Sequence, residues 1–297
     1  MLKKIRIITC LLLIITGVSQ AQISELARLE YVGLPERAEN TGTSFNRFRG
    51  AANYPIKLKE DTYFVIGADY SYIDFNVDQD LVGFNSDRLD RFQLLNINLG
   101  YTTKINKDWR IAVQIQPGFS TNATVKELSL RDNGLISGGL FFLNDKKKEK
   151  IPHQLILGIS VSGTGGFPVL PFISYYRKFH PKWSYKVGVP KMNIQYHIST
   201  KNRLKFVVRL DGFRTNLQRD VFVEGESGPQ KVDFLRQRLV LGGLRYEYKF
   251  TKNLEYYMNV SYVIDNSLEF RDRSRNTLLE LPEDNIFYLK TGIRFKL

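Results

Sequence analysis

The chain has 297 residues, of which 43% are hydrophobic, 25% charged and 13% aromatic, and its formal net charge is +13. A negative mean hydropathy excludes a bundle of membrane-spanning helices, because each such helix needs about 20 mostly apolar residues. The 16 Tyr and 20 Phe are too many for a disordered chain, and one Cys excludes a disulfide scaffold. The composition therefore leaves one large domain, or two small ones, rich in strand-forming residues.

The first 21 residues predict a secretory signal peptide. A basic segment, residues 3–6, precedes an almost wholly apolar run from Ile7 to Val18, which is too short to span a bilayer comfortably as a helix. Ser19-Gln20-Ala21 then places small residues just before a cleavage site. We expect a single mature domain at residues 22–297.

The only cysteine, Cys10, lies inside the apolar run of the signal peptide rather than after it. We therefore expect no lipid anchor at Cys10. Cleavage also removes this cysteine, which excludes zinc–thiolate sites and cysteine nucleophiles from the mature domain. Stability must then come from hydrogen bonding and burial.

Apolar and polar residues alternate along nearly the whole mature chain. The pattern is clear at 109–116, 203–210, 254–265 and 287–297. Successive side chains of a strand point to opposite faces, so each segment has one apolar face and one polar or small face. A soluble sandwich alternates in the same way, so this pattern alone does not distinguish it from a membrane barrel.

Three further features favour a transmembrane barrel over a soluble sandwich. Segments reach the roughly 9–11 residues that a membrane-spanning strand needs, longer than the usual soluble strand. Their polar faces carry Gly, Ser, Asn, Gln and charged residues, as a wet lumen would. Aromatic residues such as Tyr101, Trp109 and Trp183 lie near short turns, where Tyr and Trp prefer the membrane–water boundary.

Short and long connections alternate between the candidate strands. The strands lie at roughly 26–35, 45–58, 62–75, 91–104, 107–119, 134–143, 152–163, 171–179, 182–189, 191–199, 203–214, 235–250, 253–266 and 286–297. Alternating connection lengths are typical of an all-β, antiparallel up-and-down barrel, and lipid requires that such a sheet close on itself. We predict 14 strands. The weakest connection is Val189-Pro190-Lys191, and if no hairpin forms there the number is 12.

Three stretches of the first half stand out: they are Leu26-Ala27-Arg28-Leu29-Glu30-Tyr31, Phe45-Asn46-Arg47-Phe48-Arg49 and Tyr54-Pro55-Ile56-Lys57-Leu58. They resemble an uncharacterised, porin-like outer-membrane β-barrel family of Bacteroidota-type bacteria. The apolar and aromatic final strand from Phe287 to Leu297 resembles the signal that the barrel-insertion machinery reads, although it ends in Leu rather than Phe. The resemblance implies a fold and a location, and it implies no substrate.

The sequence offers little for catalysis. The three histidines, His153, His180 and His197, lie on different predicted strands or turns without a partner at metal-ligand helical spacing. The segment from Gly158 to Ser162 begins like a nucleophile elbow but lacks its closing Gly. A barrel enzyme built on His197 and the nearby Asn193 is a distant alternative. We expect no enzyme, no metal site and no cofactor.

Much of the basic excess falls on the predicted short turns. These lysines include Lys57, Lys59, Lys104, Lys107, Lys146, Lys147, Lys148, Lys150, Lys178, Lys182, Lys201 and Lys252. They can reach lipid phosphates at one headgroup layer, or simply keep the turns soluble. No compact basic and aromatic platform emerges, so we expect no nucleic-acid partner.

Alternation assigns a set of charged residues to the inward face as candidate site residues. They are Arg47, Arg49, Asp69, Arg110, Lys205, Arg209, Asp211, Arg245, Glu247, Lys249, Glu255, Lys290 and Arg294. Arg47, Arg49, Lys290 and Arg294 form one basic wall near barrel closure if the strands close as predicted. Such a wall gives a water-filled path a preference for anionic solutes, or its charges pair across the lumen and brace the barrel. Both readings stay open at this point.

We predict an outer-membrane barrel of a Gram-negative bacterium, porin-like, that passes small polar or anionic solutes. Its partners would be outer-membrane lipids, the barrel-insertion machinery during assembly and a small solute. The alternative is a structural or surface-interaction barrel that binds a partner through external loops such as Thr215–Asp233.

Overall fold

The computed structural model describes residues 25–35, 43–77, 89–122, 133–146, 150–225, 228–282 and 287–296. The predicted signal peptide, with Cys10, lies outside the described residues. All elements in these ranges are β-strands. None of the described residues forms a helix long and apolar enough to cross a membrane.

Fifteen strands follow one another along the chain. They are β1 (Ala27–Leu34), β2 (Thr43–Lys59), β3 (Thr62–Val77), β4 (Arg91–Lys104), β5 (Trp109–Thr121), β6 (Gly134–Lys146), β7 (His153–Val161), β8 (Val169–His180), β9 (Trp183–Val189), β10 (Lys191–His197), β11 (Asn202–Gly225), β12 (Gly228–Lys249), β13 (Leu254–Arg271), β14 (Thr277–Pro282) and β15 (Phe287–Phe295). Each pairs antiparallel with its neighbour in sequence, apart from the pair β14 and β15, since β15 pairs with β13 instead.

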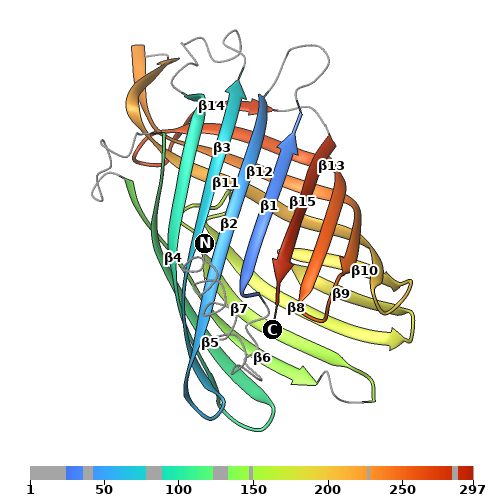
Figure 1. Ribbon diagram of the computed structural model, residues 1–297. Helices are drawn as coiled ribbons and strands as arrows, with labels where there is room; N and C mark the ends of the chain where they lie inside the picture. Colours follow the sequence, from blue (N-terminus) through green and yellow to red (C-terminus); the bar gives the residue numbers. More distant parts are fainter. Residues whose placement is uncertain are drawn as a thin grey trace, which may run out of the picture.

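Pairing of β1 with β15 closes the sheet into a barrel (Figure 1). Ala27 lies opposite Phe295, and this antiparallel register continues to Gly33 opposite Leu289. Strand β14 pairs with the end of β13 and stands outside the ring, so fourteen strands form the wall. The predicted closed antiparallel up-and-down barrel of 14 strands is confirmed.

The connection that left the strand number open does form a hairpin. β9 and β10 pair with Asn193 opposite Lys186 and Tyr196 opposite Trp183. Only Pro190 separates the two strands. The alternative of 12 strands is therefore wrong.

Short turns gather at one end of the barrel, which we call the short-turn end; the opposite end is the long-loop end (Figure 1). Ion pairs tie neighbouring turns together at the short-turn end, among them Lys104 with Asp61 at 3.2 Å and Lys146 with Asp108 at 2.5 Å. The Lys146 ammonium holds the pKa of the Asp108 carboxyl below its ordinary value.

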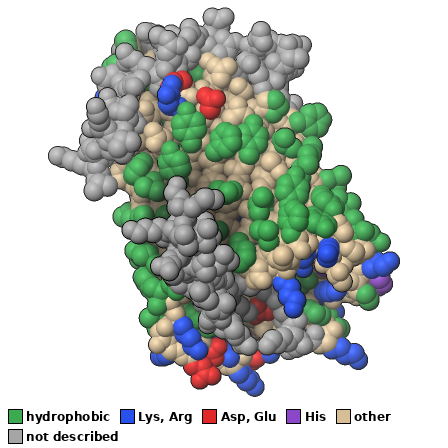
Figure 2. All heavy atoms as spheres, viewed as in Figure 1, with side chains coloured by type: hydrophobic (Ala, Val, Ile, Leu, Met, Phe, Trp, Pro, Cys, Tyr) green, Lys and Arg blue, Asp and Glu red, His purple; other side chains and the backbone are tan. Residues whose placement is uncertain are grey.

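The outward face of the barrel is apolar around its middle. Met258, Val260, Tyr262 and Ile264 of β13 are 40–52% exposed, while the side chains between them point inward or carry polar groups. Figure 2 shows hydrophobic side chains across the middle of one face and charged ones gathered toward its ends. Such a belt is stable against lipid hydrocarbon and unfavourable in water, as expected of a transmembrane barrel.

Strands β11 and β12 extend well beyond the predicted ones. They stay paired from Asn202 opposite Tyr248 to Gly225 opposite Gly228. The predicted loop Thr215–Asp233 is therefore wrong, because these residues continue the hairpin beyond the long-loop end of the belt (Figure 1). The sequence did not predict this extension, because Gly, Asp and Ser near the tip are typical of a loop.

An apolar cluster fills the interior toward the long-loop end. The Phe213 ring of β11 lies 5.6 Å from Phe45, 6.2 Å from Phe75 and 6.0 Å from Phe92, so it bridges to β2, β3 and β4. These four rings are 0–3% exposed. The two sides of the barrel therefore meet through a packed core at this level, rather than enclosing water.

The barrel wall is also pinched at the same end. Asn216 of β11 pairs with Thr121 of β5, and Ser120 Oγ donates a 2.7 Å hydrogen bond to the carbonyl of Arg214. The β7–β8 connection, residues 162–168, reaches the edge of β11 at this end, because Arg214 N donates to the carbonyl of Thr164 at 2.8 Å. At this level β5 meets β11 directly, beyond the last β10–β11 pair of Lys191 with Arg209, and we call the interior bounded by β5 to β11 below this contact the β5–β11 lobe.

Candidate functional site: the lumen wall

The thirteen candidate residues all lie on barrel strands, and most of them meet in ion-paired clusters on the inner wall. Those that join a cluster are Arg47, Arg49, Asp69, Lys205, Arg209, Asp211, Arg245, Glu247, Glu255, Lys290 and Arg294. Most are nearly buried: Arg47, Arg209, Arg245 and Lys290 are 4–7% exposed.

Glu247 of β12 is the centre of the cluster nearest the short-turn end. Its carboxylate lies 2.9 Å from Lys205 Nζ, 2.8 Å from Arg245 Nε and 2.9 Å from Arg294 Nη2. Arg203 Nη2 lies 2.9 Å from it and also pairs with Glu255. Four cations share this carboxylate and Glu255, so the cluster carries excess positive charge.

Asp211 forms a bridge across the lumen beneath the phenylalanine cluster. Its carboxylate lies 3.1 Å from Arg47 Nη2 of β2 and accepts a 2.8 Å hydrogen bond from Tyr288 Oη of β15. Lys290 Nζ lies 3.8 Å away. This bridge, which we call the Asp211 bridge, joins strands that stand well apart around the barrel wall.

Two further pairs occupy the wall near barrel closure. Lys290 Nζ lies 2.6 Å from Glu30 Oε1, and Arg49 forms a bidentate pair with Asp69 at 2.6–3.0 Å. Together with the partners of Arg47 and Arg294, these contacts pair every member of the predicted basic wall with a carboxylate. The geometry at the closure is that of a braced wall, because a buried ion left unpaired is strongly destabilising.

Arg110 stands apart from these clusters, at the short-turn end. Its Nη1 donates a 2.8 Å hydrogen bond to the carbonyl of Asp61, and its Nη2 lies 3.5 Å from the Asp61 carboxylate. Lys249 lies close enough to Arg203, Glu247 and Glu255 to interact with them electrostatically. It therefore belongs to the edge of the Glu247 cluster.

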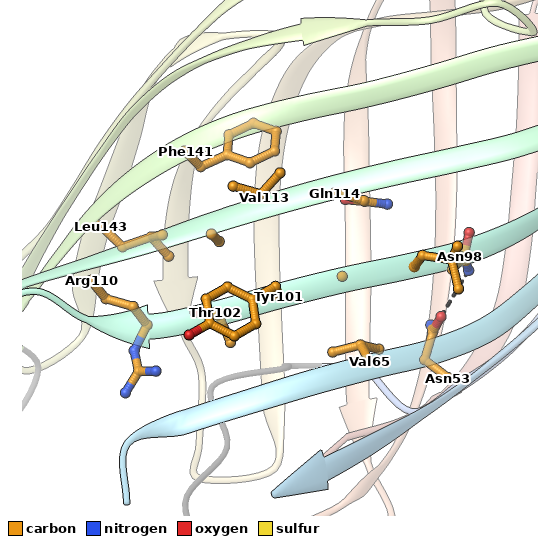
Figure 3. A pocket seen from close by; sticks show the side chains of 13 residues that line it. Asn53, Val65, Asn98, Tyr101, Thr102, Arg110, Val113, Gln114, Phe141 and Leu143 are labelled. Carbon is orange, nitrogen blue, oxygen red and sulfur yellow. Dashed lines mark hydrogen bonds between the residues drawn. The ribbon is translucent and has the colours of Figure 1, made fainter. Parts of the chain in front are cut away.

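A pocket of about 220 Å³ lies along β2 to β6, on a stretch of wall away from the ion clusters. Figure 3 shows Asn53 and Asn98 joined by a hydrogen bond at one end and Arg110 at the other. Amides such as Gln114 and apolar side chains such as Phe141 line the space between. The inner wall is therefore charged on one side and mostly uncharged on the other.

Three functional-site residues were missed from the sequence: Glu30, Lys191 and Arg203. Each lies next to an outward apolar residue on its strand. Glu30 follows Leu29, which is 69% exposed, and Lys191 precedes Met192, which is 44% exposed. The same two-residue period that found the other candidates places these three inward. Their partners depend on contacts between strands distant in sequence, which the period does not give.

Ser184 and His197 make a contact that resembles part of a hydrolase site. Ser184 Oγ lies 3.0 Å from His197 Nε2, and the ring neighbours the amide of Gln195. A nucleophile needs access to substrate and a base oriented by a third group. Ser184 is 0% exposed, and the amide of Gln195 stands where the group that orients the base would be. This pair is therefore a buried polar contact rather than a catalytic centre.

Comparison with protein families gives one match over nearly the full length. The family is described as "Domain of unknown function (DUF6268)" and covers residues 19–296. The chain belongs to this family. No curated protein matches the chain.

Several solved outer-membrane proteins are similar in overall architecture. An outer membrane channel from Pseudomonas putida F1 has a TM-score of 0.46 at 9% identity, covering 95% of this chain and 100% of that one. The KdgM porin has a TM-score of 0.37 at 8% identity, covering 91% and 99%. The outer membrane phospholipase A from Escherichia coli has a TM-score of 0.32 at 12% identity, covering 94% of each.

Proposed function

We propose that this DUF6268 protein is a porin-like passive channel of the outer membrane of a Gram-negative, Bacteroidota-type bacterium, and that it favours small anionic solutes. The observation that carries the proposal is the excess of cations on the described lumen wall. The cations are Arg47, Arg49, Lys191, Arg203, Lys205, Arg209, Arg245, Lys249, Lys290 and Arg294, against the carboxylates Glu30, Asp69, Asp211, Glu247 and Glu255. A ring of one sign of charge in a narrow lumen attracts the opposite ion and repels its own.

The lobe bounded by β5 to β11 supports passage. Some of its side chains, such as Gln114, Gln116 and Ser160, are partly buried, whereas others, such as Ser174 and Ser184, are buried like the rings around Phe213. The connection 162–168 lies over this lobe from the long-loop end. The proposed path therefore runs up the β5–β11 lobe, past the Glu247 cluster and beneath that connection.

Planar-bilayer recording tests the proposal. The folded, purified protein is added to a bilayer separating two KCl concentrations, and the reversal potential is measured. We expect discrete conductance steps and a reversal potential of the sign given by chloride selectivity. Absence of conductance, or a cation-selective reversal potential, would contradict the proposed function.

A second candidate function is a surface-interaction barrel that binds an external partner, and the extended β11–β12 hairpin favours it. Together with β13 and β14 the hairpin forms a projecting sheet with its own buried apolar residues, such as Val232 and Phe270. Deleting residues 221–232 separates the two functions. A channel still conducts without the tip, whereas a binding protein loses its partner.

The outward belt supports membrane lipids as the surrounding partner, and the barrel-insertion machinery as the partner during assembly. The lysines of the short-turn end lie where they would meet the inner headgroup layer if that end faces the periplasm. Reconstitution of the urea-unfolded protein into lipid vesicles, with and without purified insertion machinery, tests both partners. An unfolded protein that becomes soluble and folded in water alone would contradict them.

A further inference from the structure

Arg209 of β11 has two buried guanidinium donors without a hydrogen-bond partner among the described residues. Its side chain is 8% exposed, and neither Nε nor Nη2 has a hydrogen-bond partner in that part of the chain. The nearest carboxylate oxygen, Asp211 Oδ2, is 3.9 Å from Nη2, too far for a hydrogen bond. Nε–H and Nη2–H point along one edge of the guanidinium, the edge that binds two oxygens at once.

Other arginines of this barrel show what that edge binds. Arg49 directs the same Nε and Nη2 pair at Asp69, Arg294 directs it at Glu255, and Arg236 directs it at Glu269. In each case the partner is a carboxylate. Arg209 has the same edge without a carboxylate hydrogen-bonded to it, and leaving the buried donors of a charged group without hydrogen bonds costs free energy.

Lys191 of β10 adds a second cation beside this edge. It pairs directly opposite Arg209 in the β10–β11 ladder, and its strongest electrostatic neighbours are the cations Arg245, Lys205 and Arg209, followed by the carboxylate of Glu247. No ion pair of Lys191 is found among the described residues. Like charges directly opposite each other in a ladder destabilise it unless a counter-charge lies between them.

Resting on the proposed function, we infer that Arg209 and Lys191 form a binding site for the carboxylate or phosphate group of a small solute inside the lumen. The two free donors of Arg209 bind two oxygens of the group, and the Lys191 ammonium neutralises its charge from the neighbouring strand. Lys191 is partly exposed, so a solute meets Lys191 first, and the side chains around the buried Nε and Nη2 atoms of Arg209 must move for it to reach them. The Asp211 bridge lies next to the site on the side of the phenylalanine cluster, so the bound group is held just below the closed level.

Binding to the detergent-solubilised full-length protein tests the site independently of conductance. Isothermal titration uses gluconate as the carboxylate probe, glucose 6-phosphate as the phosphate probe and glucose as the uncharged control. We expect one or both anions to bind and glucose not to bind. The tighter-binding anion identifies the group that the site prefers. R209Q and K191Q should each weaken binding about tenfold or more, the size expected for losing a charge-assisted hydrogen bond.

Two further variants separate a specific site from a general charge effect. R209K keeps the charge but has no planar edge, so we expect it to lose affinity as well. R238Q removes an arginine that pairs with Glu269 near the long-loop end, and we expect it to bind as the unchanged protein does. Migration of unheated samples on a denaturing gel checks that each variant is folded.

Two results would overturn the inference: neither anion binds the unchanged protein, or R209Q and K191Q bind as tightly as it does. The channel proposal fails on a different result, namely that the folded protein does not conduct. A protein that binds gluconate through Arg209 without conducting keeps the binding site and loses the channel.

Discussion

The phenylalanine cluster offers a direct test of how the barrel is closed at its long-loop end. Phe213 is 1% exposed and contacts the rings of Phe45, Phe75 and Phe92. Replacing it with alanine removes the one ring that joins the β11 side to the other three. A buried Phe→Ala change costs about 3–5 kcal/mol, because the lost transfer free energy is joined by the cost of a cavity. The ring contacts contribute about 0.5–1.5 kcal/mol each to this loss.

Urea unfolding in lipid vesicles, followed by the fluorescence of Trp109 and Trp183, measures this loss. F206A is the matched control, since Phe206 lies on the same strand, is 51% exposed and faces outward. Lipid fills the space that an outward ring leaves, so F206A loses a transfer term without a cavity. We expect F213A to lose at least about 2 kcal/mol more than F206A. Equal losses in the two variants would refute a packed interior at this level.

Two further changes test other parts of the lumen. E247Q removes the carboxylate shared by four cations, so we expect the free energy of unfolding, measured by urea titration, to fall by about 3 kcal/mol. We also expect a stronger chloride selectivity in bilayers. An unchanged reversal potential would argue against a path beside Glu247. G166A places a Cβ 2.2 Å from the Gln237 carbonyl, so the connection 162–168 must move and we expect a larger single-channel conductance. G50A, whose added Cβ makes only an ordinary 3.6 Å contact, should conduct normally, and a normal conductance in G166A would show that this connection does not limit the path.

The wall of the barrel follows from local sequence because a strand repeats every two residues. Met258, Val260 and Tyr262 face outward as the alternation predicts, and the short connections lie at one end, apart from those of β9–β10 and β11–β12. The alternation also places Arg47 and Glu247 inward. These features depend on neighbours along the chain, so one sequence is enough to predict them.

The interior could not be predicted in the same way, because it depends on which strands meet across the lumen. Arg47 and Asp211 are 164 positions apart in sequence and form an ion pair, and nothing local to either residue indicates the other. The site around Arg209 could not be predicted for the same reason, because it depends on which strands meet. The predicted loop Thr215–Asp233 failed for a different reason: turn-forming residues at a hairpin tip resemble those of a long loop, and only pairing with β13 and β12 shows how far the strands continue.

In the proposed channel, the pairing of Thr121 with Asn216 would fix how far apart β5 and β11 stand at the long-loop end. In a barrel whose walls stay apart, shortening the external segments widens the passage. Here the backbone of one wall is hydrogen-bonded to the other, and trimming external segments leaves that join in place. Tolerance for bulkier cargo would have to come from substitutions within β5 and β11 themselves.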